Sequence, residues 1–318
     1  MQNQNHDLIF RVKRRLVEAL DLEKRHIAGV RILNDNSANQ SIATVILNGR
    51  SALISRFGST EAEFCAEFIR GDTRLASTWK SSDNLWKLSG VFPKTNRQLS
   101  DFFNVYTGAA KEMDYCGVRC ESVEFTYWRL EEECFSLFSS SSNPYNIEVL
   151  SAIFIDNPWT LALRGKRVVI IHPFAETIRS QLLRLRQMPE LVPWMPSFEA
   201  IVIKAPQTLG AERSGIHKSW TASFELLYEQ ISNIDFDVAL IGCGAYGLPL
   251  GARIKQMGKI GIHVGGALQL FFAIHGQRWF SQVSQLLDKR ALSVWSWPSL
   301  LETPKNYRQI EGGAYWSP

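Results

Sequence analysis

Residues 238–266 constrain the fold of this chain more than any other stretch. They read VALIGCGAYGLPLGARIKQMGKIGIHVGG, in which an apolar run is followed by a glycine-rich turn, a segment compatible with a helix and a second apolar run. Gly242, Gly244 and Gly247 are spaced as G-x-G-x-x-G. A strand, a glycine turn and a helix in this order direct unsatisfied backbone N–H groups to one point, where a phosphate can bind. The unit predicts a phosphate or nucleotide site; the alternative is close packing of the helix on the strand.

Apolar runs alternate with helix-like segments over the later part of the chain. We expect strands at 168–171, 199–204, 238–241 and 260–264, and helices at 174–188 and 219–233. This alternation predicts an α/β fold, with a doubly wound, mostly parallel sheet that carries helices on both faces. The chain is expected to form one large, Rossmann-like domain.

The earlier part of the chain is less regular. We expect helices at 7–28, 60–70 and 97–115, and a surface loop at 136–143. Strands are expected on either side of the Asn48-Gly49 turn within 43–56, and at 122–129. In this interpretation residues 1–40 form an N-terminal helical extension, and residues 41–318 form the domain.

Composition limits the class of protein. A net charge of +4 over 318 residues gives no reason to expect a nucleic-acid partner. No apolar run reaches 18 residues and the first residues lack a signal-peptide pattern, so a cytoplasmic protein is expected. The basic stretch from Arg11 to Arg15 is either a solvated helix face or a contact with an acidic lipid surface, which limits any membrane association to a peripheral one. Five cysteines without a C-x-x-C pair predict reduced, buried thiols.

The residues that follow the expected strands are the candidates for a site, because ligands of open α/β sheets bind beyond the carboxyl ends of the strands. In the segment from Arg56 to Glu61, Arg56 can bind phosphate and Gly58 allows close approach of the backbone. Ser59 is a candidate N-cap, and Glu61 could hold a hydroxyl, a cation or a proton. The alternative for the whole segment is an ordinary helix start.

Two histidines also follow expected strands. His172 precedes a helix start that contains Glu176, and His263 ends the second strand of the glycine unit. Each histidine either donates to phosphate oxygens or is simply buried. A nicotinamide dinucleotide fold would require an acidic residue at the end of that second strand, and His263 with Gly265 and Gly266 stands there instead.

Six blocks of this sequence, taken together and in order, resemble the GT-D-type bacterial glycosyltransferases over roughly residues 43–316. The blocks are Arg56-Phe57-Gly58 to Glu61, Gly165 through Ile178, Phe236 through Gly247, Ile262 through Ala267 with Gln269, Gly276-Gln277-Arg278-Trp279, and Glu311 through Trp316. The resemblance implies transfer of a sugar from a nucleotide-sugar donor to a saccharide or glycoconjugate acceptor, in the assembly of bacterial surface polysaccharide.

The site expected from the residues and the resemblance has a diphosphate-binding part and a catalytic part. Glu61 is the first candidate for a catalytic carboxylate, and Glu176 is the second. The residues expected at the nucleotide diphosphate are Arg56, Gly58, Ser59, His172, Gly242, Gly244, Tyr246, Gly247, His263, Gly265 and Gly266.

The resemblance also implies a divalent metal, Mn or Mg, bound at an Asp-x-Glu motif. Ser59 occupies the Asp position of that motif, and Glu61 the Glu position. Serine is a poor ligand beside a carboxylate, so we expect metal dependence to be weak or absent, with Glu61 as the remaining candidate ligand. Two other functions stay open: a catalytically inactive nucleotide-sugar-binding or scaffold protein, and a nucleotide-dependent oxidoreductase.

Overall fold

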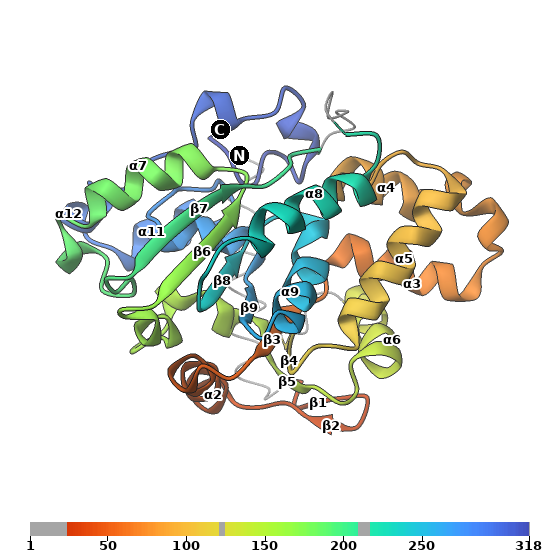
Figure 1. Cartoon of the computed structure of the whole chain (residues 1–318), viewed down its shortest axis with the longest axis horizontal. Helices are drawn as coiled ribbons and strands as arrows, with labels where there is room; N and C mark the ends of the chain where they lie inside the picture. The colour runs from red at the N-terminus through yellow and green to blue at the C-terminus, as the bar shows by residue number, and fades with distance from the viewer. Residues whose placement is uncertain (1–23, 121–124, 209–216, 318) are drawn as a thin grey trace.

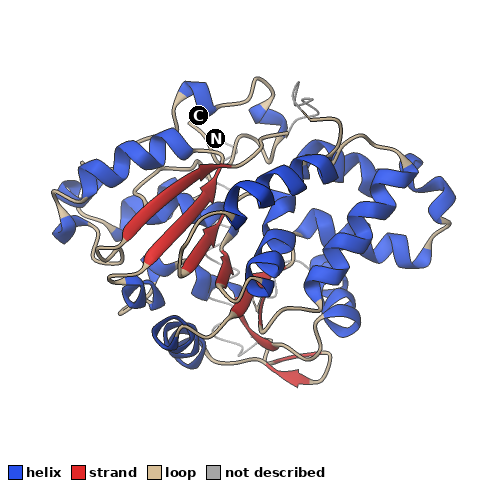
Figure 2. Cartoon of the chain, viewed as in Figure 1, coloured by secondary structure: helices blue, strands red, loops and turns tan. Residues whose placement is uncertain are grey.

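The computed structural model describes residues 24–120, 125–208 and 217–317. Seven strands form one sheet in the order β5-β4-β3-β9-β8-β6-β7, and every neighbouring pair is parallel. The strands are β3 (Ala52–Arg56), β4 (Tyr115–Val118), β5 (Asn143–Asn146), β6 (Arg167–His172), β7 (Glu199–Lys204), β8 (Val238–Ile241) and β9 (Ile260–His263). The expected α/β class is thereby confirmed, and Figure 2 shows the strands between helices.

Helices cover both faces of the sheet (Figure 1). On one face, the helices that contribute side chains to a shared hydrophobic cluster are α2 (Asp35–Asn48), α7 (Ala175–Leu185) and α10 (Leu268–Phe271), with α11 (Phe280–Leu286) and α12 (Lys289–Leu292) at the margin of that cluster. On the opposite face, the helices that contribute side chains to a second hydrophobic cluster are α3 (Ser59–Arg70), α4 (Lys80–Ser89), α5 (Asn96–Ala110), α6 (Phe125–Phe138), α8 (Trp220–Ser232) and α9 (Gly247–Gln256). Strand side chains alternate between the two clusters, as Val168 and Val169 do.

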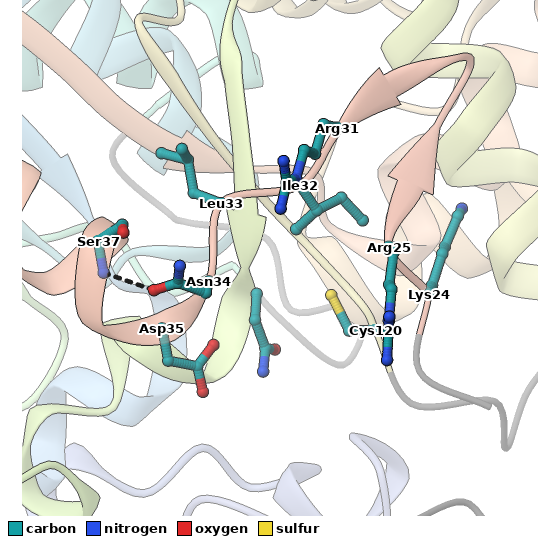
Figure 3. Close-up of a pocket in the computed structure, with 10 residues that line it drawn as sticks. Lys24, Arg25, Arg31, Ile32, Leu33, Asn34, Asp35, Ser37 and Cys120 are labelled. Carbon is teal, nitrogen blue, oxygen red and sulfur yellow. Dashed lines mark hydrogen bonds between the residues drawn. The ribbon is translucent and has the colours of Figure 1, made fainter. Parts of the chain in front are cut away.

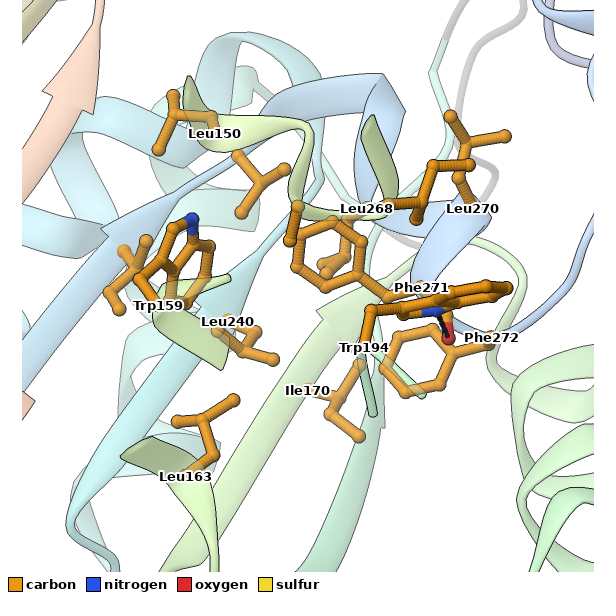
Figure 4. Close-up of a cluster of buried hydrophobic side chains, with 14 of the residues drawn as sticks. Leu150, Trp159, Leu163, Ile170, Trp194, Leu240, Leu268, Leu270, Phe271 and Phe272 are labelled. Carbon is orange, nitrogen blue, oxygen red and sulfur yellow. Dashed lines mark hydrogen bonds between the residues drawn. The ribbon is translucent and has the colours of Figure 1, made fainter. Parts of the chain in front are cut away.

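The first cluster is built from large side chains (Figure 4). Trp159, Ile170 and Leu240 pack with Phe271 beneath the sheet. The Trp194 indole N–H donates to the backbone oxygen of Phe271 at 3.1 Å, so its one polar atom is satisfied inside the core. This packing fixes α10, and with it the loop after β9.

The connections after neighbouring central strands leave toward opposite faces. The chain passes from β3 to α3 and from β8 to α9 on one face, but from β6 to α7 and from β9 to α10 on the other. In the strand order these two sets alternate, so the loops separate at the carboxyl ends of β3, β9, β8 and β6. Such separation is the geometric origin of ligand crevices in open α/β sheets.

The prediction of two strands in 43–56 was wrong for its first half, because residues 35–48 are helix α2. Asn34 caps that helix by accepting a hydrogen bond from the Ser37 N–H, and Gly49 ends it with φ of 62°. The buried residues Ala38, Ile42, Val45 and Ile46 follow a helical period. The expected boundary at residue 40 falls inside α2.

Other expectations also changed. Residues 125–129 are helical and open α6, although their alternation suggested a strand. Residues 26–31 form a small hairpin, β1 (His26–Ile27) and β2 (Val30–Arg31), because Ala28 and Gly29 both take positive φ. Helix α5 ends at Ala110, so residues 115–118 are free to form β4.

The five cysteines are buried and none forms a disulfide, as expected. Within the described ranges, no helix has the length and apolar character needed to cross a bilayer. The basic stretch from Arg11 to Arg15 lies outside the described residues.

Candidate functional site

The carboxyl ends of β3, β9, β8 and β6 bring most of the predicted site residues together. Arg56 ends β3, His263 ends β9, and His172 ends β6, while Gly242 follows β8 directly. Parallel registry places these ends at one edge, since Ile54 pairs with Ile262 and Ile241 with His263.

Arg56 lies over the loop that follows β9. Gly265 has φ of +78°, and a Cβ atom on it would overlap the Arg56 guanidinium. The close approach therefore requires glycine, both for space and for the left-handed backbone. Arg56 is half-buried, and its Nη1 donates to the Phe57 carbonyl at 3.1 Å. The loop after β9 and the end of β3 together hold the positively charged Arg56 guanidinium at the edge of the sheet.

Glu61 is a buried carboxylate in the first turn of α3. It is 6% exposed and folds back against Gly58, where any side chain would overlap it. Burial raises its pKa above the ordinary value of 4.5, while its own backbone N–H, Arg56 and a hydrogen bond to Ser89 act in the opposite direction. A carboxyl group with a raised pKa beside a guanidinium is suited to accepting and releasing a proton.

His263 is buried beneath the glycine turn and does not project from the sheet edge. Its Nδ1 lies 3.0 Å from the Ser55 hydroxyl, and its Nε2 has no hydrogen-bond partner among the described residues. The ring packs on Gly247, the third glycine of the motif, where a Cβ atom would overlap it. Burial, and secondarily Arg56, lower its pKa well below 6.5, so the ring is neutral. The missing side chain at Gly247 thus allows the start of α9 to pack closely on the end of β9.

His172 is also neutral and supports the loops around it. Its Nδ1 accepts a hydrogen bond from the Phe174 N–H at 3.0 Å, and burial lowers its pKa to about 3. A Cβ atom on Gly242 would lie 2.7 Å from the His172 ring and 2.8 Å from the Gly265 oxygen. Because Gly242 has no side chain, the segments at the ends of β6, β8 and β9 can pack directly against one another.

Part of the glycine turn is buried in the core, and part of it is exposed to solvent. Tyr246 is 2% exposed and stacks on Trp220, with ring centroids 5.2 Å apart. It belongs to the core beneath the turn. Gly244 is exposed, with φ of +56° and open space around it. Of the motif's residues, Gly244 is the one that faces solvent.

The start of α7 is already occupied by a carboxylate of this chain. Glu302, 2% exposed, accepts hydrogen bonds from the backbone N–H of Glu176 at 2.7 Å and of Thr177 at 3.2 Å. The Glu176 side chain is exposed and paired with Arg179. The structure therefore does not bring Glu176 together with Arg56 and Glu61.

The C-terminal segment completes the edge, and it passes near the carboxyl ends of the strands (Figure 1). Tyr315 packs on Gly266 so closely that a Cβ atom there would overlap its ring. Its pKa is raised by burial and by Glu311, and lowered by Arg278 and Arg56. Arg278 pairs with Glu311 at 3.1 Å, and Glu311 also raises the pKa of Glu61. Tyr315 and Glu311 thus lie within electrostatic range of the Arg56–Glu61 pair.

Ser59 has a partner that the sequence analysis missed. It is the first residue of α3 rather than its N-cap, which is Gly58. Its hydroxyl accepts a hydrogen bond from Arg119 Nη2 at 2.8 Å. Arg119 directly follows β4, and the neighbouring segments had been interpreted as a helix to 115 and a strand from 122, which concealed that strand end.

The residues at the Ser59 and Glu61 positions do not fit a divalent metal. A guanidinium 2.8 Å from the Ser59 oxygen would repel a cation there. The Glu61 carboxylate is buried and bonded to Ser89 and its own N–H. Across the described ranges, no three His, Cys, Asp or Glu side chains are grouped so that they could hold a metal ion.

A pocket of 630 Å³ opens at the carboxyl ends of β4 and β5. Cys120 and Asn146 line it from those strand ends, and Arg25 and Arg31 line it from the β1–β2 hairpin. Figure 3 shows Arg25 and Cys120 across from the start of α2, where Asn34 caps the helix. Arg25, Arg31 and Lys24 outnumber the single lining carboxylate, Asp35.

Comparison of the chain with protein-family models, curated proteins and solved structures gave no significant match.

Proposed function

We propose that this chain is a glycosyltransferase that moves a sugar from a nucleotide-sugar donor to a saccharide or glycoconjugate acceptor. The observation that carries the proposal is the placement of the Arg56 guanidinium against Gly265 and of the buried Glu61 carboxylate against Gly58, both at the carboxyl end of β3. This pair offers a cation for a diphosphate and a proton acceptor for a hydroxyl. The sequence blocks shared with GT-D-type glycosyltransferases supply the reaction class.

In an inverting transfer, one group accepts the acceptor's proton and another stabilises the leaving group. The acceptor hydroxyl oxygen forms a bond to the anomeric carbon of the donor sugar, and the bond from that carbon to the diphosphate oxygen breaks. The hydroxyl proton goes to Glu61, and the electron pair leaves with the nucleoside diphosphate. Arg56 stabilises the charge that develops on the leaving group. Neutral His263 and His172 lie beneath the loops and position them.

The proposed setting is the cytoplasmic side of surface polysaccharide assembly, where nucleotide sugars are available. It rests on the sequence resemblance alone.

Release of nucleoside diphosphate from a panel of nucleotide sugars tests the proposal. One donor should be consumed in the presence of saccharide acceptors, and the product should gain one sugar by mass spectrometry. A protein that binds a nucleotide sugar tightly and never turns it over would instead be the non-catalytic binding protein. Binding of NAD(H) in preference to every nucleotide sugar would favour the oxidoreductase.

A further inference from the structure

Leu300 and Leu301 are the most exposed large apolar side chains in the described part of the chain, at 84% and 94%. They are adjacent and form a short 3₁₀ turn with Glu302. Other exposed leucines, such as Leu47 on α2, stand singly on the surface, which is ordinary for a folded chain. Because so little of the chain surrounds them, the two leucines protrude from a convex part of the surface.

The turn that carries the leucines is anchored on both sides. Before it, the Ser299 N–H donates to the Thr177 hydroxyl at 3.0 Å, and the Ser299 hydroxyl accepts from the Leu301 N–H at 3.3 Å. After it, the buried Glu302 caps α7, and its backbone oxygen accepts from the Trp316 indole N–H at 3.2 Å. The structure therefore holds both leucines in solvent on a fixed support.

Aromatic side chains flank the turn. Trp297, three residues before Leu300, is half-buried and stacks on the exposed ring of Phe280, with centroids 5.4 Å apart. Tyr307, six residues after Leu301, is also half-buried. Such rings combine a large apolar body with partial exposure, and tryptophan and tyrosine are enriched where a protein meets the boundary between water and lipid.

The exposed charges of the same segment have one sign. Between residues 297 and 310 the single acidic residue is Glu302, which is buried at the start of α7. Lys305 and Arg308 are the basic residues, and both are exposed. The segment therefore presents an apolar tip beside positive charge, which is complementary to an anionic lipid surface.

We propose that the turn at Leu300 and Leu301 docks this chain on an anionic lipid bilayer by inserting both leucines below the headgroups. A protein partner would require a contiguous face of roughly 800 Å² on each side, far more than one protruding turn offers, whereas a bilayer deforms around a convex tip. Trp316, bonded to Glu302, packs on Tyr315 beside Gly266, so docking turns the carboxyl ends of the strands toward the lipid. The docking stands without the proposed function; only the presentation of a lipid-linked acceptor there rests on it.

Co-sedimentation of the full chain with vesicles tests the docking, using an equimolar mixture of phosphatidylcholine and phosphatidylglycerol. Leu300→Ser/Leu301→Ser should weaken binding at least about 10-fold, because two apolar side chains no longer leave water. The melting temperature without vesicles should not change, since both side chains already lie in solvent. Leu47→Ser/Leu137→Ser is the matched control and should bind as wild type does; these leucines are 64% and 52% exposed and precede β3 and β5.

The charge contribution is tested with Arg308→Gln. Its binding to the mixed vesicles should be about 5-fold weaker, the scale of one cation near an anionic leaflet, and its binding to pure phosphatidylcholine should equal that of wild type. An equal loss on both kinds of vesicle would show that Arg308 acts through the fold and would contradict recognition of anionic lipid.

The docking is overturned if wild type and Leu300→Ser/Leu301→Ser bind vesicles equally, which would assign binding to another part of the chain, or if neither binds. Self-association of wild type that the double variant loses, measured by analytical ultracentrifugation without vesicles, would assign the leucines to an interface between copies and equally overturn it. Sugar transfer to a water-soluble acceptor should be the same in both proteins. Loss of the docking and loss of the proposed function can therefore be told apart.

Discussion

Glu61 combines burial with a nearby guanidinium, and its chemistry can be separated from its structural role. Glu61→Gln keeps the size of the side chain and removes the proton acceptor. We expect turnover to fall by about 10²-fold or more, the usual scale for an acid–base group. Glu67→Gln, on the same helix and half-buried, is the control and should retain turnover. Near-normal turnover by Glu61→Gln would return Glu61 to a structural role.

The same variant has a signature in stability. Because the folded-state pKa of Glu61 is raised above 4.5, the folded chain binds more protons than the unfolded chain as pH rises past that value. Wild type should therefore lose stability relative to Glu61→Gln from pH 4.5 upward, until the native pKa is passed. Urea denaturation of both proteins across this range measures the difference, and parallel curves would contradict the raised pKa.

Gly265 offers a second test at a single residue. Gly265→Ala adds a Cβ atom where the Arg56 guanidinium lies, on a backbone with φ of +78°. Gly258→Ala is a matched control, since Gly258 has φ of +79° and open space. Both should lose roughly 1–2 kcal/mol of stability from the left-handed backbone. Only Gly265→Ala should weaken binding of nucleoside diphosphates; equal affinities would show that the position of Arg56 is unimportant.

Helix α7 depends on a contact that is distant in sequence. Its first backbone N–H groups are capped by Glu302, which lies 125 or more positions away. Glu302→Gln should destabilise the fold by about 1–3 kcal/mol, because a buried carboxylate bonded to two backbone N–H groups is replaced by an amide with one acceptor oxygen. Denaturation measures the loss. Glu199→Gln, exposed on β7, is the control. A loss no larger than that of the control would mean that the cap contributes nothing.

The elements predicted correctly were those with long apolar runs. Strands β6, β7, β8 and β9 were each recognised from residues such as Val168 to Ile171, which face helices on both sides. Strands β4 and β5 were not, since β4 begins at Tyr115, where the preceding helix was expected to end, and β5 begins and ends with asparagine and contains Pro144. Pro144 is tolerated because β5 is an edge strand.

The positions of the candidate residues at the strand ends could be predicted from the sequence, but the tertiary contacts around them could not. Arg56, Gly58 and Glu61 follow a strand that the sequence shows, and the structure brings them together. Neither the burial of His263 under Gly247 nor the capping of α7 by Glu302 has a local sequence signal. Arg119 could have been found only by recognising β4.

At the scale of the whole molecule, ligand binding should stabilise the chain without metal. A nucleoside diphosphate should raise the melting temperature by mass action, and equally so with chelator or with manganese, because Ser59 already binds Arg119. Thermal-shift curves in the two conditions measure this. Stabilisation that appears only with manganese would show that Glu61 recruits metal without a second carboxylate.

The close contact between Arg56 and Gly265 also links two positions 209 residues apart in their evolution. A relative that keeps arginine at the first position has no room for a side chain at the second, whereas loss of the arginine removes that steric limit. Substitutions at the two positions should therefore occur together across descendants of a common ancestor. Lineages that gain a side chain at the glycine should be those in which the cation, and the anion it attracts, have already been given up.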